Sequence, residues 1–188
     1  DLLWQGSPDP SALSREAFKA NWILGYLLVL AVWRASMAFS DGGFGQSVAV
    51  FLPYLVLALA AYGLIRLLAR AVARAAIYSI TSNRVILRIG AALQVTWTVP
   101  FTKVASASLA TRPMTGTGTI ALDLTEGQRI SYLALWPHLR PGFGHTVQPA
   151  FRCIPDAARV ARILSDAAQT RVNEPVVSFA PQSALAAE

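Results

Sequence analysis

The chain has 188 residues, of which 54% are hydrophobic and 14% are charged. An average soluble domain carries about 25% charged residues, so a large part of this chain is unsuited to water. The net charge of +6 does not indicate a nucleic-acid partner, because the aromatic residues lie on apolar strand faces and not among the basic residues. A single cysteine excludes an internal disulfide.

Residues 1–20 are predicted to form a cytoplasmic N-terminal segment. Because the sequence begins at Asp1 and not at Met, we expect a further stretch of the protein to precede it. Residues 21–74 follow as a transmembrane hairpin, with spans at about 22–39 and 48–68. About 20 apolar residues cross the hydrocarbon core of a bilayer, and the turn-like SDGGFGQS (40–47) is the predicted loop between the two spans.

The loop between the two spans contains no Lys or Arg. The basic residues that flank the spans are Arg15, Lys19, Arg66, Arg70 and Arg74. The positive-inside rule therefore places both termini, and the domain that follows, on the cytoplasmic side of the membrane. Arg34, near the outer end of the first span, either reaches the headgroups or contacts a partner helix. Arg66, Arg70 and Arg74 share one helical stripe that can anchor the helix at lipid headgroups or bind a partner.

The segment YSITSNRVILRIG (78–90) predicts an antiparallel β-hairpin with its turn at 82–83. In this register Tyr78 faces Leu87 and Ile80 faces Val85, so one face is entirely apolar. Further short strands are predicted at 93–99, 103–110, 119–124, 129–136 and 151–154, and an amphipathic helix begins at 155–156. We expect a membrane-anchored α+β chain in which about seven short strands over residues 75–170 form a small barrel or a sandwich, and the helix covers an open end or edge of the sheet. Residues 171–188 form an extended tail.

No pattern in the sequence indicates catalysis, a metal site or a bound cofactor, so we expect a protein that is not an enzyme. The long connector WPHLRPGFGHTVQP (136–149) is the exception to an otherwise ordinary β-domain. Its aromatic and basic residues suit a protein or lipid-headgroup interface, although the loop can also pack back over the mouth of the barrel. These candidate contacts are Trp136, His138, Arg140, Phe143 and His145.

The hairpin resembles the opening strands of bacterial PH-like domains, a family of seven-strand barrels capped by a C-terminal helix. The positions that carry the resemblance are Tyr78, Thr81, Arg84, Gly90 and Pro100. With LLWQG near the start, LALWPHLRP and IPDAARVARIL, roughly residues 2–170 resemble the photosynthetic complex assembly proteins of purple bacteria. That resemblance implies a non-catalytic role and no pigment ligand.

Two functions follow as expectations. The first is an assembly factor or accessory subunit of the purple-bacterial reaction centre–light-harvesting 1 complex in the intracytoplasmic photosynthetic membrane. Its partners would be reaction-centre subunits, notably H, light-harvesting 1 polypeptides and membrane lipids, and a homo-oligomer is left open. The alternative is a membrane-anchored PH-like module that binds lipid or peptide and is unrelated to photosynthesis.

Overall fold

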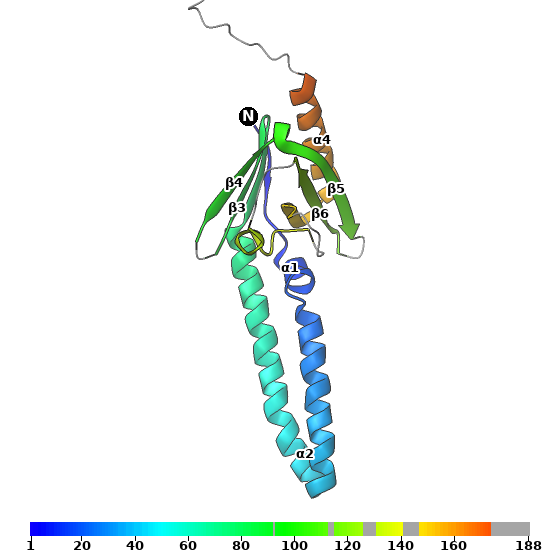
Figure 1. The fold of residues 1–188 in the computed structure, drawn as a ribbon. Helices are drawn as coiled ribbons and strands as arrows, with labels where there is room; N and C mark the ends of the chain where they lie inside the picture. The colour runs from blue at the N-terminus through cyan, green and yellow to red at the C-terminus, as the bar shows by residue number, and fades with distance from the viewer. Residues whose placement is uncertain (92, 113–114, 126–130, 141–146, 174–188) are drawn as a thin grey trace, which may run out of the picture.

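The computed structural model describes residues 1–91, 93–112, 115–125, 131–140 and 147–173, apart from the side chains of 133 and 134. Figure 1 shows a β-domain at one end of the molecule and a pair of long helical arms that project from it.

The arms belong to one helical element, α2 (Ala20–Ala75), which is interrupted at Gly43. Gly43 has φ 71° and ψ −163°, a conformation that glycine adopts more easily than residues with a Cβ. The chain reverses in this region, so the two arms run beside each other (Figure 1), and the Ser47 hydroxyl donates a 2.9 Å hydrogen bond to the Ala35 carbonyl. The predicted loop over 40–47 is wrong, because these residues stay helical on both sides of the single glycine that breaks the helix.

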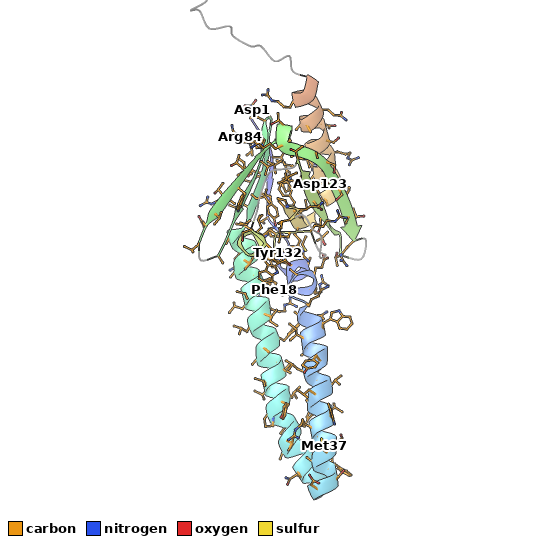
Figure 2. All side chains as sticks on the ribbon, in the orientation of Figure 1. Asp1, Phe18, Met37, Arg84, Asp123 and Tyr132 are labelled. Atoms are coloured by element: carbon orange, nitrogen blue, oxygen red, sulfur yellow. The ribbon has the colours of Figure 1, made fainter. Side chains whose placement is uncertain are left out.

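Figure 2 shows side chains projecting outward along both arms, and many of the exposed ones are large and apolar. Trp22, Tyr26 and Trp33 are 77%, 67% and 63% exposed. The buried positions of the arms are small, and they are Ala20, Ala31, Ala35, Ala58, Ala69 and Ala73. By length and composition, α2 is the one helix in the described part of the chain that could cross a membrane.

The larger sheet has the order β1-β2-β3-β4. Its centre is the predicted hairpin, with β2 (Ile77–Thr81) and β3 (Arg84–Ile89), and β4 (Val95–Pro100) forms one edge. The predicted register is confirmed, since Tyr78 lies opposite Leu87 and Ile80 opposite Val85. All four of these side chains are fully buried, as the apolar face requires.

The N-terminal residues are part of the β-domain. Strand β1 (Leu2–Gly6) pairs with β2 and was not predicted. Helix α1 (Pro10–Glu16) follows, and the Asp9 carboxylate caps it by accepting a 2.6 Å hydrogen bond from the Ala12 N–H. Ala12 and Leu13 are buried against Ala73 and Cys153, so α1 seals the junction between the arms and the domain.

The smaller sheet has the order β5-β6-β7, with β5 (Val104–Arg112), β6 (Thr117–Leu124) and β7 (Ala150–Pro155). No ladder joins the two sheets within the described residues, so the predicted closed seven-strand barrel is wrong. Pro100 ends β4, and the 3-10 turn η1 (Phe101–Lys103) redirects the chain before β5 begins. The two sheets therefore face each other as separate layers (Figure 1).

The strand predicted over 129–136 is also wrong in its described part. Residues Tyr132–Leu135 form a short helix, α3, in which the Trp136 N–H donates a 3.0 Å hydrogen bond to the Tyr132 carbonyl. A helical turn satisfies these backbone groups locally, and the segment lacks the clean alternation that a half-buried strand needs. Residues 126–130, which include the beginning of the strand predicted over 129–136, lie outside the described residues.

Helix α4 (Ala157–Asn173) covers the core between the sheets. Its predicted apolar stripe is confirmed, since Ala157, Val160 and Leu164 are at most 4% exposed. The helix approaches β6 closely, because a Cβ added at Gly118 would lie 2.6 Å from the Ala157 Cβ. The predicted tail begins too early, since residues 171–173 are helical, and 174–188 lie outside the described residues.

Candidate functional site

Strand β5 is an exposed edge of the smaller sheet. In the described part of the chain it pairs with β6 alone, and every residue after Val104 is exposed. An edge strand presents backbone N–H and C=O groups that can pair with another extended chain. The register of β5 shifts between Val104 and Ser106, which marks a bulge at the start of the strand.

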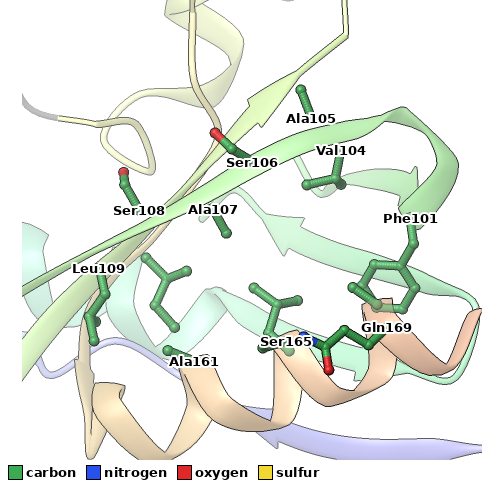
Figure 3. Close-up of a pocket in the computed structure, with 13 residues that line it drawn as sticks. Phe101, Val104, Ala105, Ser106, Ala107, Ser108, Leu109, Ala161, Ser165 and Gln169 are labelled. Carbon is green, nitrogen blue, oxygen red and sulfur yellow. The ribbon is translucent and has the colours of Figure 1, made fainter. Parts of the chain in front are cut away.

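An open groove of about 630 Å³ lies between β5 and α4. Figure 3 shows Ala107 and Leu109 of β5 directed toward the helix, whereas Ser106 and Ser108 point away from it. The side chains that the helix contributes are uncharged, and Phe101 lies at one end. The groove has no charged side chain among its described lining residues.

These features suit an extended polypeptide. Backbone groups at a sheet edge provide affinity when a peptide adds a strand, and the pockets beside the edge select alternate side chains. The short side chain of Ala107, which β5 directs toward the helix, leaves room beside the strand, and the uncharged lining favours an apolar or neutral polar segment. Binding of this kind requires no catalytic residue.

A cluster of polar side chains, Tyr78, His138 and Arg152, is buried inside the β-domain. The Tyr78 hydroxyl and His138 Nδ1 share a hydrogen bond of 2.5 Å, and the Tyr78 oxygen accepts a longer one of 3.4 Å from the Arg152 backbone N–H. The Arg152 guanidinium donates to the carbonyls of Pro137 and Glu16, each at 3.2 Å. These contacts tie β7, the segment after α3 and the end of α1 together.

Burial changes the acidity of the groups in this cluster. It lowers the pKa of His138 to about 4, with a further contribution from the positive charge of Arg152. It raises the pKa of Tyr78 and raises that of Cys153 to about 12. All three groups are therefore uncharged at neutral pH, which is consistent with a structural role for the cluster.

The candidate contacts of the connector 136–149 lie in different surroundings, some buried and some exposed. His138 is 1% exposed and lies inside the domain, so its prediction as a surface contact is wrong. Trp136 is 44% exposed and packs edge-on against Phe18 at 5.0 Å between ring centroids. Arg140 is exposed and donates to the Gln148 side chain. The candidates Phe143 and His145 lie outside the described residues.

The arginines predicted as lipid or partner contacts lie along α2. Arg34, Arg70 and Arg74 are exposed. Arg66 is half-buried because its guanidinium donates a 3.1 Å hydrogen bond to the Tyr62 hydroxyl and lies 5.7 Å from the centre of that ring. None of these arginines lines the groove at β5.

The groove itself was missed by the sequence prediction. Its strand was expected at 103–110, but as one of the strands of a closed barrel. The available signal was composition, because VASASLATR has few large side chains to bury. A strand without a large apolar face is more easily accommodated at an edge than inside a barrel.

The sequence comparisons agree with this architecture. A family model described as "Bacterial PH domain" matches residues 23–168, and the chain belongs to this family. A curated protein of Rhodobacter capsulatus is 52% identical to this chain over 191 residues, which cover 99% of this chain and 87% of the relative. That relative is described as an uncharacterized 23.7 kDa protein in the puhA 5′ region. No solved structure matches the chain.

Proposed function

We propose that this chain is a non-catalytic assembly protein, or accessory subunit, of the PuhB kind for the purple-bacterial reaction centre–light-harvesting 1 complex. The observation that carries the proposal is the 52% identity, over nearly the whole chain, with a protein described by its place in the puhA 5′ region. Because puhA is a photosynthesis gene, this position links the relative to photosynthesis.

We propose further that α2 crosses the membrane twice. A straight crossing takes about 20 helical residues, whereas α2 has 56 and is broken near its middle at Gly43. Water would solvate the exposed tryptophans and leucines of the arms poorly, while lipid tails would cover them at little cost. The basic residues at both ends of α2 favour a cytoplasmic position for the β-domain.

The groove between β5 and α4 is the surface that we assign to a protein partner. Its occupant would be an extended, uncharged segment of a reaction-centre subunit, such as H, or of a light-harvesting 1 polypeptide. The exposed backbone of β5 and the uncharged lining support this assignment.

Affinity purification from photosynthetically grown membranes tests the function. The tagged full-length protein should bring down reaction-centre and antenna polypeptides, and a deletion strain should assemble less of the complex. If nothing of the complex co-purifies and the deletion leaves its yield unchanged, the photosynthetic proposal fails. A membrane-anchored lipid- or peptide-binding module unrelated to photosynthesis is then the better description.

A pair of substitutions tests the groove. Ala107→Arg places a long charged side chain toward α4 at an exposed position, so it should block the groove without unfolding the domain. Co-purification should fall severalfold. Ser106→Arg adds the same charge on the side that points away, and it should retain co-purification. Equal yields from the two variants would show that the partner docks elsewhere.

A further inference from the structure

Two hollows meet where the first arm enters the β-domain. The upper one, of about 560 Å³, lies between α1, the start of α2 and the turn after β5. The lower one, of about 520 Å³, runs along the first turns of α2. Trp22 lines both, so the two hollows lie next to each other at this side chain.

The upper hollow is cationic. Arg15, Lys19 and Arg112 line it, and Glu16 is its one acidic residue among the described lining. Glu16 pairs with Arg112 at 3.1 Å, but the Arg112 side chain remains 59% exposed. The Arg15 Nε donates to the Ser11 carbonyl at 3.2 Å, which holds the guanidinium beside α1. In the described part of the chain Lys19 has no ion-pair partner. The hollow therefore carries an excess of positive charge and can accept an anion.

The lower hollow is apolar. Its lining includes Gly25, Tyr26 and Val29 below the indole of Trp22. A Cβ added at Gly25 would meet nothing within 4 Å, so the glycine leaves open space on the face of the helix. Trp22 and Tyr26 are 77% and 67% exposed, and tryptophan and tyrosine are enriched at membrane–water interfaces.

We propose that the two hollows form a single binding site for an anionic phospholipid. The phosphate lies among Arg15, Lys19 and Arg112, and an acyl chain follows the apolar hollow past Gly25. This inference rests on the proposed membrane crossing of α2. It adds a lipid of defined charge as a ligand that joins the first arm to the β-domain.

The shape of the site separates a lipid from a soluble phosphate. Both present a phosphate anion to the same cations, but only a lipid has a chain that can occupy the lower hollow. Substitutions in the two hollows should therefore act together on lipid binding, whereas only those in the upper hollow would affect inorganic phosphate.

Native mass spectrometry of the full-length protein in detergent micelles measures lipid retention directly. Wild-type protein should retain phosphatidylglycerol in preference to phosphatidylcholine. Arg15→Gln combined with Lys19→Asn should reduce this preference roughly 25-fold, from about fivefold for each charge near the phosphate. Asparagine suits position 19, because Lys19 has a positive φ of 53°. The matched control, Arg84→Gln with Arg159→Gln, removes two exposed charges from β3 and α4 and should leave the preference unchanged.

A glycine pair tests the lower hollow. Gly25→Leu fills the open space and should weaken phosphatidylglycerol retention about fivefold, since several chain methylenes lose their contact surface. Gly63→Leu is the control, because a Cβ at Gly63 also meets nothing within 4 Å but lies on the other arm, outside the site. It should retain the lipid normally.

Three results would overturn the site. The first is equal lipid preference in the wild type and the Arg15/Lys19 variant. The second is an equal loss in the Arg84/Arg159 control, which would indicate a general effect of charge. The third is displacement of the lipid by excess inorganic phosphate with no effect of Gly25→Leu, which would identify a soluble anion as the ligand. Because retention is measured on purified protein, it remains informative when reaction-centre proteins fail to co-purify.

Discussion

Two arginines contact the same residue, Glu16, but one of them is buried and the other is exposed to solvent. Arg152 is buried and donates to the Glu16 carbonyl, whereas Arg112 is exposed and pairs with the Glu16 carboxylate. The buried guanidinium of Arg152 is held by carbonyls from two separate segments. The exposed guanidinium of Arg112 faces a hollow that has space for a ligand. The comparison separates a charge that holds the structure together from one that is available for binding.

Removal of the buried arginine should have the largest effect. Arg152→Ala deletes two charge-assisted hydrogen bonds and leaves the carbonyls of Pro137 and Glu16 without their donor. We expect the free energy of unfolding to fall by about 4 kcal/mol. Urea unfolding of the full-length protein in detergent micelles, followed by tryptophan fluorescence, measures the change. A loss below about 1 kcal/mol would show that the buried contacts contribute little.

Acidification should weaken the same cluster by a smaller amount. The pKa of His138 is about 4 in the folded protein, below its usual value of 6.5, because burial and the charge of Arg152 disfavour the protonated ring. The unfolded chain therefore binds a proton first as the pH falls. The stability contributed by neutral His138 is complete above pH 6.5 and is lost between pH 6.5 and 4, by at most about 3 kcal/mol.

Unfolding curves across this pH range test the assignment to His138. His138→Gln removes the titrating ring, so it should flatten the dependence between pH 6.5 and 4 even where it lowers stability throughout. An unchanged slope in this variant would assign the pH dependence to other groups.

Removal of the exposed arginine should have the smallest effect on stability. Arg112→Gln breaks a partly solvated ion pair, and such pairs contribute less than about 1 kcal/mol. The midpoint of urea unfolding should therefore move only slightly, while phosphatidylglycerol retention falls. A loss of stability as large as that of Arg152→Ala would remove the distinction between the two arginines.

Local features of this fold could be predicted from the sequence. The register of β2 and β3 follows from alternation within a few residues of one turn, and the buried stripe of α4 follows from helical spacing. Apolar length likewise identified the region of α2, which is long and apolar enough to cross a membrane. Each of these predictions depends on neighbours in the chain, where side-chain periodicity is informative.

Features built from distant segments could not be predicted. Leu2 pairs with Thr81 across the whole of α2, and no periodicity within LLWQG reveals that partner. The strand predicted over 93–99 begins only at Val95, and Leu93 lies in the bend before it and is 83% exposed. Arg15 and Lys19 line the same hollow as Arg112 only because the fold brings these distant segments together. The groove at β5 likewise requires the position of α4 to be known.

The short connections at the two ends of α2 have a mechanical consequence. Three residues separate α1 from α2, and Ala76 alone separates α2 from β2. The domain is thus fastened to both arms, and a body fastened at two points cannot swivel about either one. If the arms cross the membrane, the exposed edge of β5 is held at a fixed distance from the membrane surface. The two attachments would then present β5 to a partner in one orientation.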